Sequence, residues 1–337
     1  MGTSVTVDSM IPRKATVITM FHHSFSMLVY GPVPSRRLGR SLGVNHIPPK
    51  TCSYSCVYCQ LGRTDNMLID RRRFYDPGHI IEMVREKVEE VGDEIDYVTF
   101  VPDGEPTLDV NLGSMIESVN DLGAKTAVIG NASLLWMEDV RSDLMEADWV
   151  SMKVDAVTED MWKRVDRPHG ELDHGKVLDG VRAFAKEYGS TLATETMLVE
   201  GLNDTEEPNH VARFLEEIEP DVSYVAIPTR PPAEGWVKPA GEEAVNRAYQ
   251  VFSGVLDDVE YLIGYEGNAF ASSGDFEEDV LSITAVHPMR VEAVEALLRR
   301  DGSEWGEVER LIGEDKLVEL EFMDNRFYMR RISSRAR

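Results

Sequence analysis

Three closely spaced cysteines are the residues of this chain with the clearest chemical potential. They are Cys52, Cys56 and Cys59, a C-x3-C-x2-C pattern, and the 337-residue chain has no other cysteine. Three thiolates at this spacing can ligate three irons of a four-iron, four-sulfur cube, which leaves the fourth iron without a protein ligand. Because an open iron can chelate a small molecule, the pattern predicts a catalytic iron–sulfur site rather than a structural one.

Two other uses of the cysteines stay open at this point. Three cysteines cannot all pair, so a disulfide framework would always leave one thiol over. A zinc ion would need a fourth ligand, and His46 is the only histidine near the cysteines in the sequence. The spacing therefore predicts an iron–sulfur cluster, with a Cys3His zinc site as the alternative.

The charge balance argues against one broad class of function. The chain carries 35 Lys and Arg against 60 Asp and Glu, a net charge of −25, and the acidic residues are spread along it. Extensive nucleic-acid binding normally leaves a basic surface, which this composition does not supply. Local basic patches remain available, and the candidates are Arg36, Arg37, Arg40, Arg71, Arg72 and Arg73.

The composition also indicates a reducing compartment. The apolar run over 15–30 is interrupted by His22, His23 and two serines, so it is too polar to span a bilayer, and it lacks a cleavage pattern. Free thiols and an oxygen-sensitive cluster persist where the surroundings are reducing. We therefore expect a cytoplasmic protein with no membrane partner.

Strands and helices alternate along most of the chain. Strands are expected over 43–47, 95–101, 126–129, 149–154, 192–199 and 222–227, and helices over 77–91, 112–122, 136–144, 175–188 and 206–217. Such alternation produces right-handed crossovers and a parallel sheet. We predict an α/β fold, a partial (β/α)6 TIM-type barrel over 27–274, preceded by a loose extension over 1–26.

The pattern changes after about residue 275. Helices are expected over 291–299 and 304–312, followed by strands over 317–322 and 326–331. Two helices and a hairpin resemble a winged helix, so 275–337 is predicted to be a small winged-helix-like α+β domain. Nucleic acid would be contacted there through Arg299, Arg300, Arg330 and Arg331. The acidic helix surfaces favour a packing or docking module instead.

Functional side chains of a parallel barrel gather at the carboxyl ends of its strands. Applied strand by strand, this rule selects Gly104, Glu105, Asn131, Ser133, Lys153, Asp155, Arg230 and Tyr265. Ser133 has an alternative role as the N-cap of the next helix. Asn131 and Ser133 follow the third strand as short polar side chains.

The barrel interior is expected to hold the substrate. Lys153 and Asp155 alternate along one buried strand, so both point to the same face. Buried charges need a partner or a task, and the two either neutralise each other or act on a substrate, Lys153 by forming an imine with a carbonyl. Arg230, with Arg167 and His169, would suit an anionic group, and each can equally serve as a local loop cap.

The cysteine motif, with Tyr58 directly before Cys59, resembles the signature of the radical S-adenosylmethionine superfamily. The runs 31–45 and 50–62 resemble more narrowly the group related to the wyosine-base tRNA enzyme, 4-demethylwyosine synthase. The resemblance implies that the open iron binds S-adenosylmethionine and that an electron from the cluster cleaves it to a 5′-deoxyadenosyl radical. It also implies an electron donor such as ferredoxin or flavodoxin.

The same resemblance assigns roles to residues at the strand ends. Glu105 would accept from the ammonium of the cosubstrate, with Gly104 permitting close backbone approach, and Asn131 and Ser133 would bond its ribose or carboxylate. The motif of the superfamily places a glycine where this chain has Asp103.

One departure limits the narrower resemblance. The wyosine enzyme carries a second cluster on three further cysteines, and this chain has none. We therefore predict a single-cluster enzyme that abstracts hydrogen from an unidentified substrate, with RNA or protein modification among the outcomes. The alternative is a non-catalytic, metal- or cluster-bearing protein that regulates or binds nucleic acid through its C-terminal domain.

Overall fold

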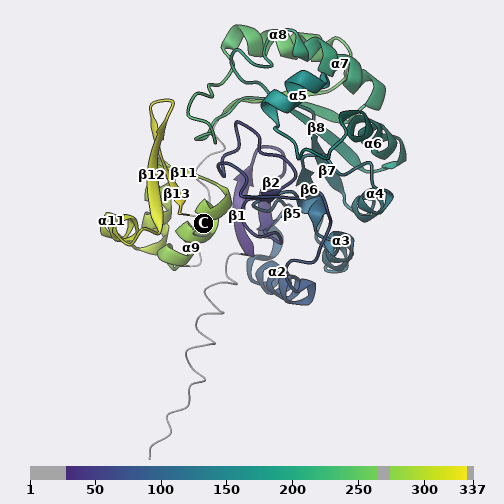
Figure 1. Cartoon of the computed structure of the whole chain (residues 1–337). Helices are drawn as coiled ribbons and strands as arrows, with labels where there is room; N and C mark the ends of the chain where they lie inside the picture. Colours follow the sequence, from purple (N-terminus) through teal and green to yellow (C-terminus); the bar gives the residue numbers. More distant parts are fainter. Residues whose placement is uncertain (1–27, 265–273, 332–337) are drawn as a thin grey trace, which may run out of the picture.

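The main body of the chain is a curved eight-stranded sheet. The computed structural model describes residues 28–264 and 274–331, where the strand order is β1-β2-β5-β6-β7-β8-β9-β10 (Figure 1). The strands are β1 (Val29–Ser35), β2 (Gly39–Val44), β5 (Tyr97–Phe100), β6 (Thr126–Gly130), β7 (Trp149–Lys153), β8 (Thr191–Met197), β9 (Val222–Ala226) and β10 (Val259–Leu262). Neighbouring strands are parallel except β1, which pairs antiparallel with β2.

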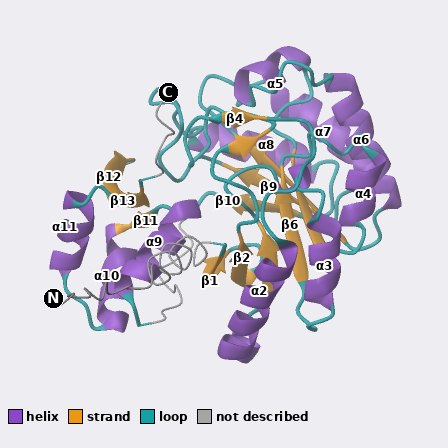
Figure 2. Cartoon of the chain, turned by 60° about the horizontal axis from the view of Figure 1, so that its bottom comes forward, coloured by secondary structure: helices purple, strands orange, loops and turns teal. Residues whose placement is uncertain are grey.

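Helices cover the outer face of this sheet (Figure 2). They are α2 (Pro77–Val91), α3 (Leu112–Asn120), α4 (Glu138–Leu144), α5 (Glu159–Val165), α6 (His174–Glu187), α7 (Glu207–Ile218) and α8 (Glu242–Ser253). Two short strands, β3 (Thr51–Cys52) and β4 (Asn66–Met67), form a separate parallel pair in the long connection after β2.

Helix α2 illustrates how the sequence sets an element. The Asp76 carboxylate accepts from the backbone N–H groups of residues 78 and 79, and Pro77 occupies the first turn, where it loses no hydrogen bond. Ile80, Ile81 and Val84 lie on one face at helical spacing and are buried. Each such side chain contributes about 1.5–3 kcal/mol on burial. The helix predicted over 77–91 has these bounds.

The turn between β1 and β2 packs against the concave face of the sheet, near the amino-terminal ends of the central strands. Leu38 in that turn packs in one buried cluster with Ala127, Trp149 and Ala193, which point inward from three successive strands. Inward and outward side chains alternate along a strand, so the next inward-facing residues, nearer the carboxyl ends, form a second layer inside the barrel, called the interior layer below. That layer is polar.

A C-terminal module packs against the β1 edge of the half-barrel (Figure 1). It consists of α9 (Phe276–Val286), α10 (Val291–Asp301), α11 (Trp305–Gly313) and a sheet ordered β11-β13-β12, with β11 (Met289–Arg290), β12 (Leu317–Phe322) and β13 (Asn325–Arg330). Tyr30 and Val33 of β1 lie in the same hydrophobic cluster as Phe276 and Tyr328. The module therefore shares its core with the barrel.

The predicted α/β half-barrel with a small C-terminal α+β domain is confirmed, with additions. Strand β1 and helices α5, α8 and α9 were not anticipated, and the sheet has two strands beyond the six expected. The C-terminal pair of helices and the hairpin are present, joined by β11 and α9. The predicted extension over 1–26 lies outside the described residues.

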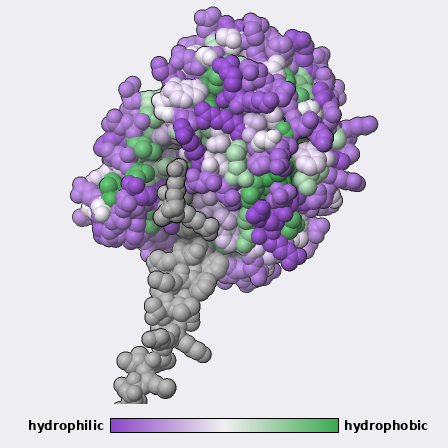
Figure 3. All heavy atoms as spheres, in the orientation of Figure 1, coloured by the Kyte–Doolittle hydropathy of each residue, from purple (hydrophilic) through white to green (hydrophobic). Residues whose placement is uncertain are grey.

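The surface is mainly hydrophilic on the face drawn in Figure 3, with apolar residues scattered over it. Among the described residues, no helix combines the length and the apolar character that crossing a membrane requires.

Candidate active site

The three cysteines lie on a loop that follows β2 at the carboxyl edge of the sheet. Cys52 ends β3, and the backbone N–H of Cys59 donates to the Cys56 carbonyl over 3.1 Å. The loop is fixed to the segment after α5, because Ser55 N donates to the Asp166 carbonyl at 3.0 Å and Val57 N to that of Val165 at 2.9 Å. All three thiols are half-buried.

The donor set fits an iron–sulfur cluster. Burial raises the pKa of Cys52 to about 12 and raises the pKa of the other two thiols as well. Neighbouring acids add to this, Glu105 at Cys52 and Asp166 at Cys56. Cysteine ligates a metal as the thiolate, and bound iron ions would supply the positive charge that offsets this rise in pKa.

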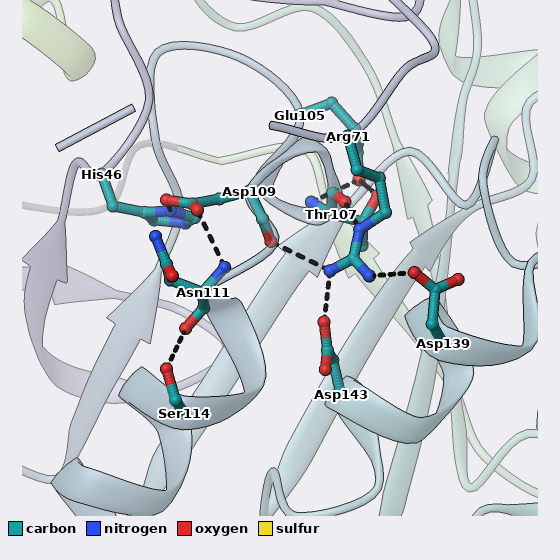
Figure 4. Close-up of polar contacts among 9 residues, drawn as sticks. All are labelled: His46, Arg71, Glu105, Thr107, Asp109, Asn111, Ser114, Asp139 and Asp143. Atoms are coloured by element: carbon teal, nitrogen blue, oxygen red, sulfur yellow. Dashed lines mark hydrogen bonds and ion pairs between the residues drawn. The ribbon is translucent and has the colours of Figure 1, made fainter. Parts of the chain in front are cut away.

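His46 does not complete a zinc site with the cysteines. Its side chain is fully buried, and its Nδ1 lies 3.2 Å from Asp109 Oδ2 (Figure 4). Within the described ranges, no group of three or more His, Cys, Asp or Glu side chains is arranged to hold a single metal ion. The Cys3His alternative therefore has no geometric support from His46.

Gly104 brings the loop after β5 against the cysteine loop. A Cβ built on it would lie 1.7 Å from the Thr51 carbonyl oxygen, so no other residue fits here without a shift of backbone. The N–H of Glu105 donates to the same carbonyl at 3.2 Å. The close approach is thus made to the strand that carries Cys52.

The Glu105 carboxylate lies between the ends of β5 and β6. It is 1% exposed, and it accepts from Asn131 N at 2.7 Å and from Thr107 Oγ1 at 2.6 Å. Burial raises the pKa of Glu105, and the hydrogen bonds from Thr107 and Asn131 oppose that rise. The carboxylate is therefore fixed in orientation beside Cys52.

Asn131 connects β6 to the cysteine loop. Its Nδ2 donates to Ser53 Oγ at 2.9 Å and to Cys52 Sγ at 3.5 Å, and its Oδ1 accepts from Ser133 N at 3.0 Å. The hydroxyls of Ser53 and Ser133 lie 2.6 Å apart. Ser133 is not a helix N-cap, because α4 begins at Glu138. Ser53 was not singled out from the sequence, since a serine in a loop carries no signal.

The layer above Leu38 is an ion cluster built on Glu195 of β8. One carboxylate oxygen accepts from Arg37 of the β1–β2 turn and the other from Lys153 of β7. Burial lowers the pKa of Lys153, and Arg37 adds to that decrease. Lys153 is thus ion-paired with Glu195, while the negative charge of Asp155 opposes the lowering of the Lys153 pKa by burial. The hypothesis that Lys153 and Asp155 neutralise each other stays a prediction. Arg37 was predicted only as part of a basic patch.

Asp155 is bound to the cysteine loop and to β8. Its carboxylate accepts from the Tyr58 hydroxyl and from Met197 N, the second at 2.6 Å. Lys153 Nζ lies 5.1 Å from the centre of the Tyr58 ring. Burial, and then the neighbouring Asp155, raise the pKa of Asp166 well above its usual value, and Asp166 lies 3.4 Å from Cys56 Sγ. A chain of polar contacts thus runs from the interior layer to the cysteines.

The loop arginines pair with protein groups. Arg167 and Arg63 both bind Glu234, and their hydrogen bonds lower the pKa of that carboxyl to about 2. Arg230 donates to Gln60 at 2.8 Å, next to Cys59, and also contacts the His287 ring of the C-terminal module. These arginines lie at the rim of the site, where their side chains bind protein groups rather than an anionic ligand.

The backbone N–H of Glu171 donates to His169 Nδ1 at 3.3 Å, so this histidine serves as a local loop cap. Tyr265 lies outside the described residues.

Comparisons with known proteins place the chain in a family. Residues 47–215 match the family described as the Radical SAM superfamily. A UPF0026 protein of Methanocaldococcus jannaschii is 45% identical over 312 residues, which cover 91% of this chain and 97% of that protein.

One solved structure shows the same fold, and a second is reported for comparison. A radical SAM methyltransferase from Sphaerobacter thermophilus superposes with a TM-score of 0.51 at 15% identity, covering 66% of each chain. A structure of TYW1 with a lysine-pyruvate adduct bound gives a TM-score of 0.49 at 15% identity, over 74% of this chain and 91% of that one. On the family match and the close relative, this chain belongs to the radical SAM superfamily.

Proposed function

We propose that this chain is a single-cluster radical S-adenosylmethionine enzyme in which Cys52, Cys56 and Cys59 hold one [4Fe–4S] cluster. The observation that carries the proposal is the meeting of three strand ends. Asn131 after β6 contacts Cys52 Sγ after β2 and, through its backbone N–H, Glu105 after β5. When bound, the cluster supplies the electron for reductive cleavage of S-adenosylmethionine.

The chain's own residues bind and orient the cosubstrate. A carboxylate offers about four lone-pair sites, and Glu105 uses three of them on Asn131 N, Thr107 N and Thr107 Oγ1. In this proposal the remaining site, on Oε2, accepts from the ammonium group of the cosubstrate. Asn131 and Ser133 bring short polar side chains to the same edge, and Gly104 keeps the loop close to Thr51.

The interior layer receives the substrate in this proposal. Lys153, Asp155 and Arg37 line it, Arg230 lies at its rim, and Tyr265 is proposed from its place after β10. An imine at Lys153 would require its ammonium to leave Glu195 and lose a proton, and burial lowers its pKa in that direction. The proposed reaction is RNA modification, protein modification or rearrangement, depending on the substrate. The proposed electron donor is a ferredoxin or flavodoxin in the cytoplasm.

A nucleic-acid-binding role of the C-terminal module has less support. Arg331 pairs with Asp315 at 2.8 Å, and Arg299 lies 3.9 Å from Glu295. Arg330 is drawn toward Asp103 of the barrel, whose charge opposes the lowering of its pKa by burial. Phosphate contacts through these arginines would have to displace carboxylates of the same chain.

The test is production of 5′-deoxyadenosine by the anaerobically reconstituted protein with dithionite and S-adenosylmethionine. The proposal predicts product from the natural protein, none from Cys56→Ala and at least tenfold less from Glu105→Gln, which keeps the shape of the side chain and loses its charge. Product formed equally by Cys56→Ala would overturn the assignment. A cluster-bearing protein that forms no deoxyadenosine would favour the regulatory alternative.

A further inference from the structure

Arg71 is the buried cation that the proposed chemistry has not used. Its side chain is only 6% exposed, although it belongs to the run predicted as a basic surface patch. A guanidinium has five N–H donors in a rigid fork, and burying it is costly unless acceptors surround it. The structure supplies four such acceptors, all in one corner of the fold (Figure 4).

Two of the acceptors are carbonyls of the loop that follows Glu105. Nε donates to the Thr107 carbonyl at 2.9 Å, and Nη2 donates to the Asp109 carbonyl, also at 2.9 Å. These two residues flank the end of a short 3-10 turn, Pro106–Leu108, whose N-cap is Glu105 itself. Arg71 therefore binds the backbone of the segment that directly follows Glu105.

The other two acceptors anchor the guanidinium to helix α4. Nη1 donates to Asp139 Oδ2 at 2.6 Å, and Nη2 contacts Asp143 Oδ2. The neighbouring backbone adds to this binding, because Arg72 N donates to the Leu108 carbonyl at 2.8 Å. The loop is thus bound both to helix α4 and to the backbone at Arg72.

Thr107 connects Arg71 to the cosubstrate site. Its N–H and hydroxyl donate to Glu105 Oε1 at 3.2 and 2.6 Å, while its carbonyl accepts from Arg71. A shift of Thr107 would move two of the three hydrogen-bond donors that orient the carboxylate, the third being Asn131 N. Groups that bind a charged ligand need their supporting contacts fixed to fractions of an ångström.

We propose that Arg71 is a positioning residue for S-adenosylmethionine binding: it fixes Thr107 and thereby the orientation of Glu105. This inference rests on the proposed function. Lysine at this position would keep the charge, but its single nitrogen cannot reach two carbonyls and two carboxylates as the fork does. Methionine would keep the apolar stem and remove every donor.

The experiment compares Arg71→Lys and Arg71→Met with Arg310→Met, which removes an arginine bound by Glu277, Glu307 and Glu314 in the C-terminal module. Calorimetric titration of the reconstituted proteins with S-adenosylmethionine gives Kd, with iron content and Tm recorded for each. We expect Arg71→Met to raise Kd by about tenfold or more, Arg71→Lys to raise it less, and Arg310→Met to leave it unchanged.

Each other outcome has a distinct meaning. Unchanged Kd in iron-loaded Arg71→Met and Arg71→Lys would overturn the positioning role while leaving the proposed function intact. Equal weakening by Arg310→Met, with parallel loss of iron, would show general destabilisation and also overturn it. Failure of the natural protein to bind S-adenosylmethionine would instead remove the proposed function, and the inference with it.

Discussion

Among single residues, Asp103 carries a buried carboxyl with an incomplete set of partners. It is 1% exposed, and it exchanges two hydrogen bonds of 2.9 Å with Asn45. Among the residues that the structure describes, none provides a hydrogen-bond partner for its Oδ1. Burial raises the pKa of Asp103 to about 7, against the Asn45 hydrogen bond and the charge of Arg330. Asp103, which stands where the superfamily motif has glycine, therefore has a pKa near neutral pH.

This pKa predicts a specific dependence of stability on pH. Because the folded-state pKa lies above the unfolded one, the folded protein holds a proton between about pH 4 and pH 7 that the unfolded chain has released. The contribution of Asp103 is therefore fully present below pH 4 and is lost as pH rises toward 7. The whole shift corresponds to on the order of 4 kcal/mol.

Asp103→Asn removes the group, so the variant should gain stability relative to the natural protein as pH rises from 5 to 8. Urea unfolding across that range measures it. A constant difference between the two proteins would show that Asp103 does not titrate there.

Gly104 gives a second prediction for a single residue. A Cβ would lie 1.7 Å from the Thr51 carbonyl oxygen, so Gly104→Ala must push the loop after β5 away from Cys52. We expect a loss of about 1–3 kcal/mol in the free energy of unfolding and reduced iron retention. Gly235→Ala is the matched control, since nothing lies within 4 Å of its Cβ position. Equal effects of the two changes would contradict the tight contact.

Considered as elements, the strands and helices differ in how far the sequence revealed them. Helix 77–91 was predicted from its apolar period, which is a local signal. Strand β1 was missed, because Pro32 and Pro34 interrupt its pattern, and it pairs only along one edge. The cysteine spacing likewise predicted the cluster loop, whereas Arg37 reaches Glu195 across 158 residues of sequence. No local pattern encodes such a contact.

The cluster formed by Glu195, Arg37 and Lys153 predicts coupling between the β1–β2 turn and the barrel. Removing a carboxylate that two cations share leaves them facing each other without compensation. We expect Glu195→Gln to lower the free energy of unfolding by about 2–3 kcal/mol. A double-mutant cycle with Arg37→Met should return an interaction energy of about 1 kcal/mol or more. Additive changes in the free energy of unfolding would show that Arg37 of the turn is not coupled to Glu195.

For the whole molecule, the net charge of −25 is the dominant electrostatic fact. Many ion pairs are exposed, such as Arg182 with Asp179 and Glu217, and contribute little individually. Self-repulsion among the excess carboxylates destabilises the compact state. Salt screens this repulsion, because the Debye length is about 10 Å at 0.1 M ionic strength.

We therefore expect Tm to rise when KCl is increased from 0.05 to about 1 M, since repulsion is screened more than the weak surface pairs are lost. Differential scanning calorimetry measures this, with sucrose at matched osmolality as the control for solvent exclusion. A Tm that falls with salt would mean that the ion pairs, rather than the repulsion, control stability.

The central claim is that three cysteines hold one open cluster. The most direct test is electron paramagnetic resonance of the reduced, reconstituted protein with and without S-adenosylmethionine, alongside iron and sulfide analysis. The account predicts about four irons and four sulfides per chain, a signal that shifts when S-adenosylmethionine is added, and no such signal in Cys56→Ala. Stoichiometric zinc, or a cluster signal indifferent to S-adenosylmethionine, would contradict it.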